Sequence, residues 1–227
     1  MEEAKIIEVE EKAETSEPEK KELALAVERE PVAIAPAAAT MWNDINNMKL
    51  AMQSAKLLAS ASAIPDAYKN SIGNCLIAID LSTRMGISPV SIMQYSQVVK
   101  GNFTWKGQAC KALIDGNGKF ANSKYVMFGE PGTDEWGCRV EAINKYTGET
   151  VVGPEVTMKM AKAEGWYDKS GSKWQTMPGL MLKYRAAAFF ARTECPESLM
   201  GFYTSEEMND IKGYPAAASE PTVISIN

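Results

Sequence analysis

The chain has 227 residues, 45% of them hydrophobic and 23% charged, with a formal net charge of −5. Length and composition are those of an ordinary globular protein, either one domain with tails or two small domains. The sequence has no histidine, no signal-peptide pattern at its start and no apolar run near the roughly 20 residues that cross a membrane. Histidine-based catalysis and histidine–metal sites are therefore excluded, and we expect a reduced, cytoplasmic protein without membrane contact.

Both ends of the chain are predicted to be flexible. Residues 1–40 are rich in Glu, Lys and Ala, include prolines and lack aromatic residues. Such a segment cannot bury enough apolar surface to offset the entropy of ordering it. Residues 213–227 have a similar character, so the folded body is expected to span residues 41–212.

The first half of this body is predicted to be helical, with one hairpin. Gly86 is a stop signal for one helix and Pro89 a start signal for the next. Two short β-prone runs about Gly101-Asn102 predict the hairpin. In chain order, the expected elements are helices at 42–59, 76–85 and 89–95, a hairpin at 97–105 and a helix at 108–114.

The second half is predicted to hold antiparallel strands followed by helices. Pro154 and Pro178 each occupy a position that favours the first turn of a helix. The expected elements are strands at 124–128, 138–144 and 149–152, helices at 154–164 and 178–192, and a short helix from Ser205. This order, without regular strand–helix alternation, predicts an α+β fold.

Basic residues are concentrated in the middle of the chain. Residues 100–192 hold fourteen basic and nine acidic residues, whereas residues 1–40 hold eleven Glu against five basic residues. Residues 193–227 are again acidic, with six acidic residues against one basic. A basic centre between acidic ends is typical of an anion-binding surface with shielding tails, although an ordinary lysine-bearing surface has a similar balance.

No motif marks a catalytic centre. The chain lacks the GxxxxGK[ST] phosphate loop, a GxGxxG loop after a strand and the GxSxG elbow, and its carboxylates show no paired spacing. The cysteines form no CxxC pair, so we expect neither a zinc knuckle nor a disulfide framework. They are Cys75, Cys110, Cys138 and Cys195.

The predicted helix over 178–192 has two arginines on one side. Arg185 and Arg192 are seven positions apart and fall on nearly one stripe, whereas Lys183 points roughly the other way. The rest of this helix is apolar, so its arginines need anionic partners. Those partners are either carboxylates of the chain itself or phosphates of a ligand in a groove.

Aromatic residues stand beside cations in the predicted hairpin. Phe103 and Trp105 share one face by the two-residue period of a strand, and Lys100 and Lys106 flank them. Cations beside aromatic rings suit stacking on bases together with phosphate contact. Packing of both rings in the core is the alternative.

The same mixture recurs in the loop at 165–173. Lys169 and Lys173 lie in a Gly/Ser/Lys-rich segment between Trp166 and Trp174. A solvated loop held in place by two buried tryptophans would give the same pattern as a nucleic-acid contact.

The order of these features resembles the phage single-strand annealing proteins of the RecT/Redβ family. The similarity is collinear and covers roughly residues 70–212. It comprises Met85-Gly86-Ile87-Ser88-Pro89, Lys106-Gly107, Asp115-Gly116-Asn117-Gly118-Lys119-Phe120, Cys138-Arg139-Val140, Trp174, Pro178, Met181, Lys183, Arg185, Arg192 and Glu206-Glu207.

The resemblance implies an ATP-independent, non-catalytic recombinase with an α+β, Rad52-like core, in which a β-hairpin and a small antiparallel sheet pack with helices. Such proteins bind single-stranded DNA, form rings or helical filaments, and anneal the strand to its complement. The implied partners are single-stranded DNA, the annealed duplex, further copies of the chain, a phage exonuclease and a host single-strand-binding protein. No cofactor is required, with Mg²⁺ assisting annealing, and the implied location is the cytoplasm of a bacterial host.

The resemblance also assigns residues to the DNA groove by position. These are Lys100, Lys183, Arg185 and Arg192. Charge and placement add Lys106, Lys111 and Lys173, and Trp105 is added as an aromatic residue beside cations. Gly179-Leu180 departs from the basic pair found in Redβ-like sequences at this point.

Two other classes of function remain as alternatives. A phage structural or assembly protein would oligomerise without affinity for an oligonucleotide. A metal-dependent DNA enzyme built on carboxylates that only the fold brings together would degrade DNA with Mg²⁺.

Overall fold

The computed structural model describes residues 41–211, which belong to one compact unit and combine helices with two small sheets. The predicted α+β class is therefore confirmed. The segments predicted to be flexible, 1–40 and 213–227, lie outside the described residues.

Helices form the first part of the described chain. The helix predicted at 76–85 begins earlier, at Ile72, because the Ser71 side chain caps it by accepting a hydrogen bond from the Asn74 amide. Gly86 ends this helix with a φ of 65°, as its sequence position indicates. The elements are α1 (Ile45–Ala59), the 3₁₀ turn η1 (Asp66–Tyr68), α2 (Ile72–Met85) and α3 (Pro89–Tyr95).

A three-stranded sheet follows, and it contains the predicted hairpin. Strands β1 (Ser96–Val99) and β2 (Asn102–Trp105) pair antiparallel, and β7 (Tyr203–Thr204) adds in parallel to β2. The turn is Lys100-Gly101 rather than Gly101-Asn102, with φ values of 51° and 79°. Positive φ at both turn residues matches the twist of a two-residue hairpin.

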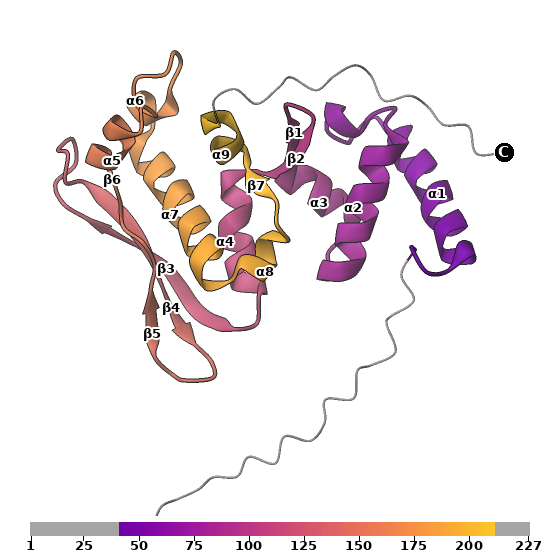
Figure 1. The fold of residues 1–227 in the computed structure, drawn as a ribbon, viewed down its shortest axis with the longest axis horizontal. Coiled ribbons are helices and arrows are strands. Elements are labelled where there is room, and N and C mark those ends of the chain that lie inside the picture. Colours follow the sequence, from indigo (N-terminus) through magenta and orange to yellow (C-terminus); the bar gives the residue numbers. More distant parts are fainter. Residues whose placement is uncertain (1–40, 212–227) are drawn as a thin grey trace, which may run out of the picture. The chain divides into compact units, whose positions relative to one another are not determined.

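The second sheet has the order β3-β4-β5, and β6 also pairs with β4. Helix α7 lies against this sheet (Figure 1) and covers the buried β4 residues Cys138, Val140 and Ala142. Helix α4 packs against both α7 and β3. The elements are α4 (Gly107–Gly116), β3 (Phe120–Phe128), β4 (Gly137–Asn144), β5 (Thr150–Val152), β6 (Val156–Thr157) and α7 (Pro178–Glu194).

The helix predicted at 154–164 is partly wrong. Val156 and Thr157 form strand β6 against Cys138 and Gly137, and α5 (Met158–Ala163) begins only after them. Pairing with β4 outweighs the helix-start signal of Pro154, and the Thr157 hydroxyl then caps α5 by accepting from the Met160 amide at 3.1 Å.

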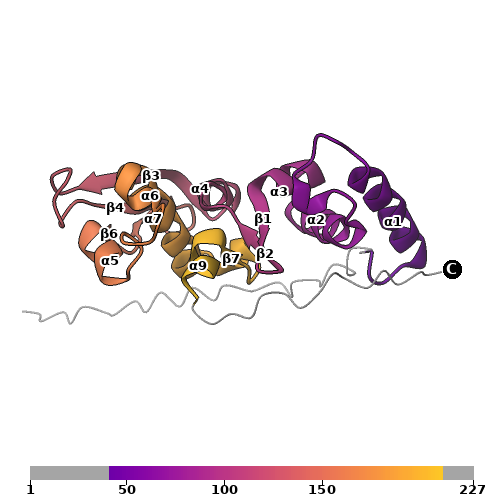
Figure 2. The ribbon, with the colours of Figure 1, turned by 90° about the horizontal axis from the view of Figure 1, so that it is seen from above.

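Three short helices complete the unit: α6 (Lys173–Thr176), α8 (Pro196–Leu199) and α9 (Ser205–Asp210). Helix α9 starts with a capping box, in which the side chains of Thr204 and Glu207 each bond the other's backbone amide. Figures 1 and 2 both show α9 beside α7 and next to β7. Among residues 41–211, no single helix is long and apolar enough to cross a membrane; only the pair α2–α3, bent by 109°, passes such a test by length and composition.

Candidate nucleic-acid interface

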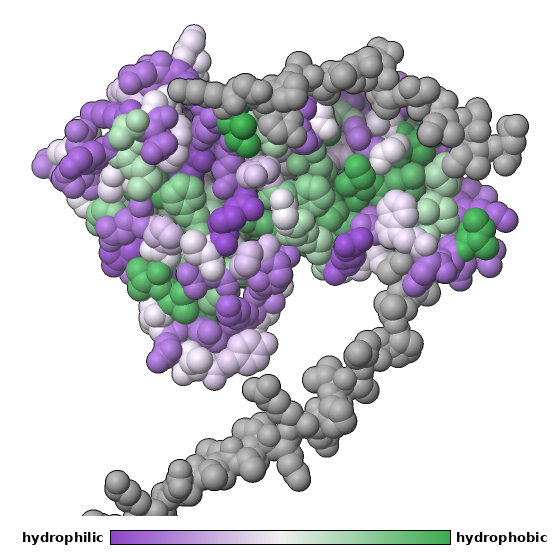
Figure 3. All heavy atoms as spheres, in the orientation of Figure 1, coloured by the Kyte–Doolittle hydropathy of each residue, from purple (hydrophilic) through white to green (hydrophobic). Residues whose placement is uncertain are grey.

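An open groove of about 660 Å³ lies where four segments meet: the start of α4, the loop at 165–173, one side of α7, and α9. Four of its lining residues are cationic, and two are carboxylates, Glu206 and Asp210. The cations are Lys106, Lys169, Lys173 and Arg185. Three of the predicted site residues therefore share one groove, and Figure 3 shows a largely hydrophilic surface over α5 and α6.

Two lysines of the groove, Lys173 and Lys106, are available to a ligand to different degrees. Lys173, the first residue of α6, is exposed and has no ion pair within residues 41–211. Lys106 precedes α4 and donates from its ammonium to the Gln94 carbonyl at 2.7 Å. Because a carbonyl leaves the charge of Lys106 uncompensated, both residues present net positive charge.

The loop at 165–173 is held by two buried tryptophans. The rings of Trp166 and Trp174 lie 5.4 Å apart, and both side chains are almost fully buried. Ser172 links them, since its hydroxyl donates to the Trp166 carbonyl at 2.6 Å and accepts from the Trp174 amide at 3.3 Å. The tryptophans therefore fix the loop in place and leave Lys169 and Lys173 on its surface.

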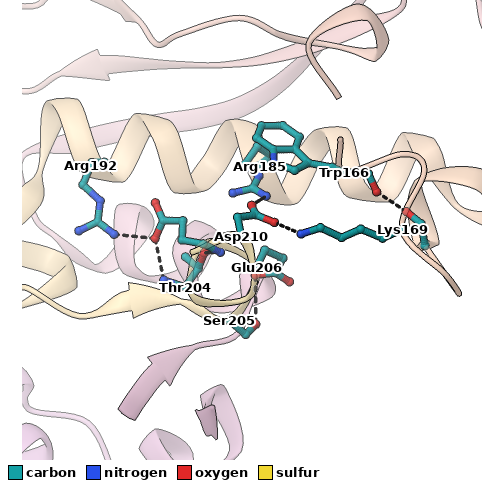
Figure 4. A network of polar contacts seen from close by, with 10 residues as sticks. Trp166, Lys169, Arg185, Arg192, Thr204, Ser205, Glu206 and Asp210 are labelled. Atoms are coloured by element: carbon teal, nitrogen blue, oxygen red, sulfur yellow. Dashed lines mark hydrogen bonds and ion pairs between the residues drawn. The ribbon is translucent and has the colours of Figure 1, made fainter. Parts of the chain in front are cut away.

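Arg185 is buried, with 5% of its surface exposed. Its guanidinium lies over the Trp166 ring, 3.9 Å from the ring centre, and its Nη2 donates to Asp210 at 2.5 Å (Figure 4). The same carboxylate also pairs with Lys169. The Nε of Arg185 is buried and has no hydrogen-bond acceptor among residues 41–211.

Arg192 and Lys100 contact the same short helix. Arg192 donates from Nη2 to Glu207 at 2.6 Å and to the Phe202 carbonyl at 3.3 Å. Lys100 donates to the carbonyls of Met208 and Ile211, each at 3.2 Å. The structure therefore gives the arginine stripe of α7 the first of the two predicted kinds of partner, carboxylates of the chain itself.

Trp105, predicted to contact DNA, lies in the core instead. It is fully buried, its Nε1 donates to the Leu199 carbonyl at 3.1 Å, and Phe103 meets it edge to face at 5.1 Å. A ring with no exposed surface cannot stack on a base, so Trp105 belongs to the core. The period-2 pattern placed it on the right face of β2 but could not tell whether that face is covered.

A second cationic position lies beside the groove. Lys111 on α4 and Lys183 on α7 both lie over the ring of Tyr125, at 5.9 and 5.8 Å from its centre. Lys111 also pairs with Asp115 at 2.7 Å, whereas Lys183 has no ion pair within residues 41–211. Burial raises the pKa of Tyr125, so its phenol stays neutral between the two ammonium groups.

Two helices, α4 and α7, connect this position with the groove. Gln108 and Leu180 line the groove, and Lys111 and Lys183 follow each of them by three residues. Residues three apart are neighbours on a helix surface. Lys173 is exposed and Lys106, Lys111 and Lys183 are half-buried; we call these four cations the lysine path.

The sequence did not reveal the roles of three of the residues described here. Tyr125 had no signal beyond its place in a predicted strand, and the acidic residues Glu207 and Asp210 gave no sign of which cations they would meet. No group of three or more His, Cys, Asp or Glu residues in the described part of the chain could hold a metal ion.

No protein-family model matches the chain, and neither a curated protein nor a solved structure shows significant similarity to it.

Proposed function

We propose that this chain binds single-stranded DNA through the lysine path and anneals complementary strands without ATP. One observation supports this most: Lys106 and Lys173 line one open groove, and Lys111 and Lys183 lie three residues beyond groove residues on α4 and α7. Three of these cations, Lys106, Lys173 and Lys183, have no anionic partner among residues 41–211. A row of uncompensated charges attracts a polyanion.

Lysine side chains suit this role because an ammonium group contacts phosphate as a point charge and reads no base. Each neutralised phosphate releases counterions, so affinity for a single strand falls with salt by a logarithmic slope of about 0.7 per contact. Base edges stay free to test a second strand. Correct pairing then stabilises the product by about 1.4 kcal/mol per base-pair step.

Annealing on this path needs no bond chemistry. Two complementary strands repel each other, and the protein lowers that repulsion by neutralising one of them. The rest of the proposal follows from the family resemblance: a protein of phage-type recombination in the cytoplasm of a bacterial host, with a Rad52-like core. A phage exonuclease would supply the strand, and a host single-strand-binding protein would be displaced from it.

The proposed active form is an oligomer. The lysine path of one chain reaches only a few phosphates, whereas a ring or helical filament of chains would place such paths along one strand. Successive contacts then act as intramolecular binding events, which multiplies weak individual affinities. Annealing should therefore depend on protein concentration more steeply than binding to a short oligonucleotide does.

The direct test measures fluorescence anisotropy of a labelled oligo(dT) as salt is raised. Lys173→Ala/Lys183→Ala should weaken binding and reduce the salt slope by about 1.4, the loss of two phosphate contacts. Lys49→Ala/Lys145→Ala is the matched control, since it removes two exposed lysines on α1 and in the β4–β5 turn. Equal loss in both variants, or no binding by the unchanged chain at low salt, would contradict the proposal and favour an assembly protein.

A further inference from the structure

The lysine path leaves a second group of cations unused, and every one of them contacts α9. Lys100 comes from the β1–β2 turn and Lys169 from the loop before α6, while Arg185 and Arg192 come from one side of α7. Arg185 and Arg192 are seven residues apart, which places them about 10 Å apart along the helix axis. Together, the four cations form a positively charged surface that α9 covers, which we call the cationic bed.

Helix α9 meets this bed with acceptor groups only. Asp210 accepts from Lys169 and Arg185, and Glu207 accepts from Arg192 (Figure 4). At the end of the helix, the carbonyls of Met208 and Ile211 accept from Lys100. Carboxylates and the negative end of a helix thus supply the negative charge that faces these cations.

The fit of α9 to Arg185 is incomplete. A guanidinium has five donors, yet the buried Nε of Arg185 finds no acceptor in the described part of the chain, and Asp210 is shared with Lys169. A buried donor without an acceptor is costly. A phosphate offers more oxygen atoms than this shared carboxylate and can bind the guanidinium fork in a bidentate manner.

The attachment of α9 is mostly polar. Its one fully buried apolar side chain is Met208, and the strand before it, β7, pairs with β2 over two residues. Met200 and Gly201 precede this segment with φ values of 49° and 80°, where the chain turns sharply. Detachment of α9 exposes this one methionine, a loss that new ion pairs with phosphate can offset.

We propose that the bed under α9 is a second, covered anion-binding site, and that phosphates of single-stranded DNA replace Glu207 and Asp210 on it when α9 detaches. The inference rests on the proposed function, because the lysine path brings the strand to Lys169 and Arg185, which line the same groove. Helix α9 then acts as an internal competitor that restricts binding to strands able to displace it.

The test compares two full-length variants with the same change in net charge. Glu207→Gln/Asp210→Asn keeps the side-chain volume of α9 but removes its charges. Glu130→Gln/Glu135→Gln is the control, because both residues are exposed in the β3–β4 loop and have no ion pair within residues 41–211.

The α9 variant should bind oligo(dT) about tenfold more tightly than the unchanged chain at low salt, with a salt slope steeper by about 1.4. The control variant should stay within about twofold. Equal or weaker binding by the α9 variant, while the unchanged chain binds, would overturn the covered site and leave the lysine path standing. If neither the unchanged chain nor the α9 variant binds oligo(dT), both the covered site and the lysine path are contradicted.

If the α9 variant does not fold, amide hydrogen exchange of the unchanged chain tests the covered site instead. Adding oligo(dT) should speed amide exchange in residues 205–210 and leave α2 unaffected. Unchanged or slower exchange in α9 at saturating oligo(dT) would show that the strand binds without displacing the helix, and the covered site would be wrong.

Discussion

The guanidinium of Arg185 lies 3.9 Å from the centre of the Trp166 ring and pairs with Asp210 on its other flank. This contact joins three segments that are separate in the sequence: the loop before α6, helix α7 and helix α9. A buried cation held by a ring and one carboxylate stabilises their arrangement.

Loss of Arg185 should therefore be costly to the fold. Arg185→Ala is expected to lower the free energy of unfolding by about 3 kcal/mol, since it removes the ring contact and leaves Asp210 with Lys169 alone. Arg139→Ala is the comparison, because Arg139 is more accessible than Arg185, pairs with Glu141 and Glu155, and should cost at most about 1 kcal/mol. Urea denaturation measures both; equal losses would show that the burial of Arg185 contributes nothing.

Trp105→Phe tests the assignment of Trp105 to the core. The variant loses the hydrogen bond to the Leu199 carbonyl and part of a fully buried ring, so we expect about 2 kcal/mol less stability. Oligo(dT) affinity should stay within about twofold, because the buried ring cannot touch a base. A large drop in affinity with unchanged stability would restore Trp105 as a stacking residue.

Two glycines of α4 should respond in opposite directions to alanine. A Cβ at Gly107 would lie 2.9 Å from Cβ of Tyr184 and 3.2 Å from Oε1 of Glu206, so Gly107→Ala is expected to destabilise the fold by about 1–3 kcal/mol. A Cβ at Gly116, in the same helix, would have nothing within 4 Å. Gly116→Ala should stabilise by about 0.5–1 kcal/mol. Thermal melting of both variants checks the prediction, and a neutral Gly107→Ala would mean that α4 and α7 are not packed this closely.

The buried cysteines predict loss of stability at high pH. Burial raises the pKa of Cys138 and Cys195 from 9.0 to about 11. Above pH 9.0 the unfolded chain loses these protons while the folded chain keeps them, so the free energy of unfolding falls as pH rises from 9.0 towards about 11. Cys138→Ala/Cys195→Ala should show a shallower fall in urea denaturation between these limits; an identical fall would assign it to other groups.

Local signals in the sequence were sufficient for most elements. Gly86 and Pro89 mark real helix ends, and the hairpin lies where its β-prone runs predict it. The errors arise where tertiary pairing decides. Residues 156–157 join β4 as a strand despite Pro154, because the partner strand lies about twenty residues earlier, outside the reach of local signals.

In the candidate site, too, local signals predict part of the arrangement and tertiary packing decides the rest. Helical spacing correctly placed Arg185 and Arg192 on one side of a buried helix and required anionic partners for them. It could not identify those partners, because Glu207 and Asp210 reach the arginines only through the turn after α8 and the parallel pairing of β7 with β2. Likewise, Lys111 and Lys183 meet at Tyr125 only because α4 and α7 pack together on the sheet.

The annealing rate of two complementary labelled oligonucleotides, followed by energy transfer without ATP, tests the central claim most directly. The unchanged chain should accelerate duplex formation at low salt, and Lys106→Ala/Lys111→Ala/Lys173→Ala/Lys183→Ala should abolish this acceleration while retaining the far-UV circular dichroism of the unchanged chain. No acceleration by the unchanged chain, or full acceleration by the fourfold variant, would contradict the account.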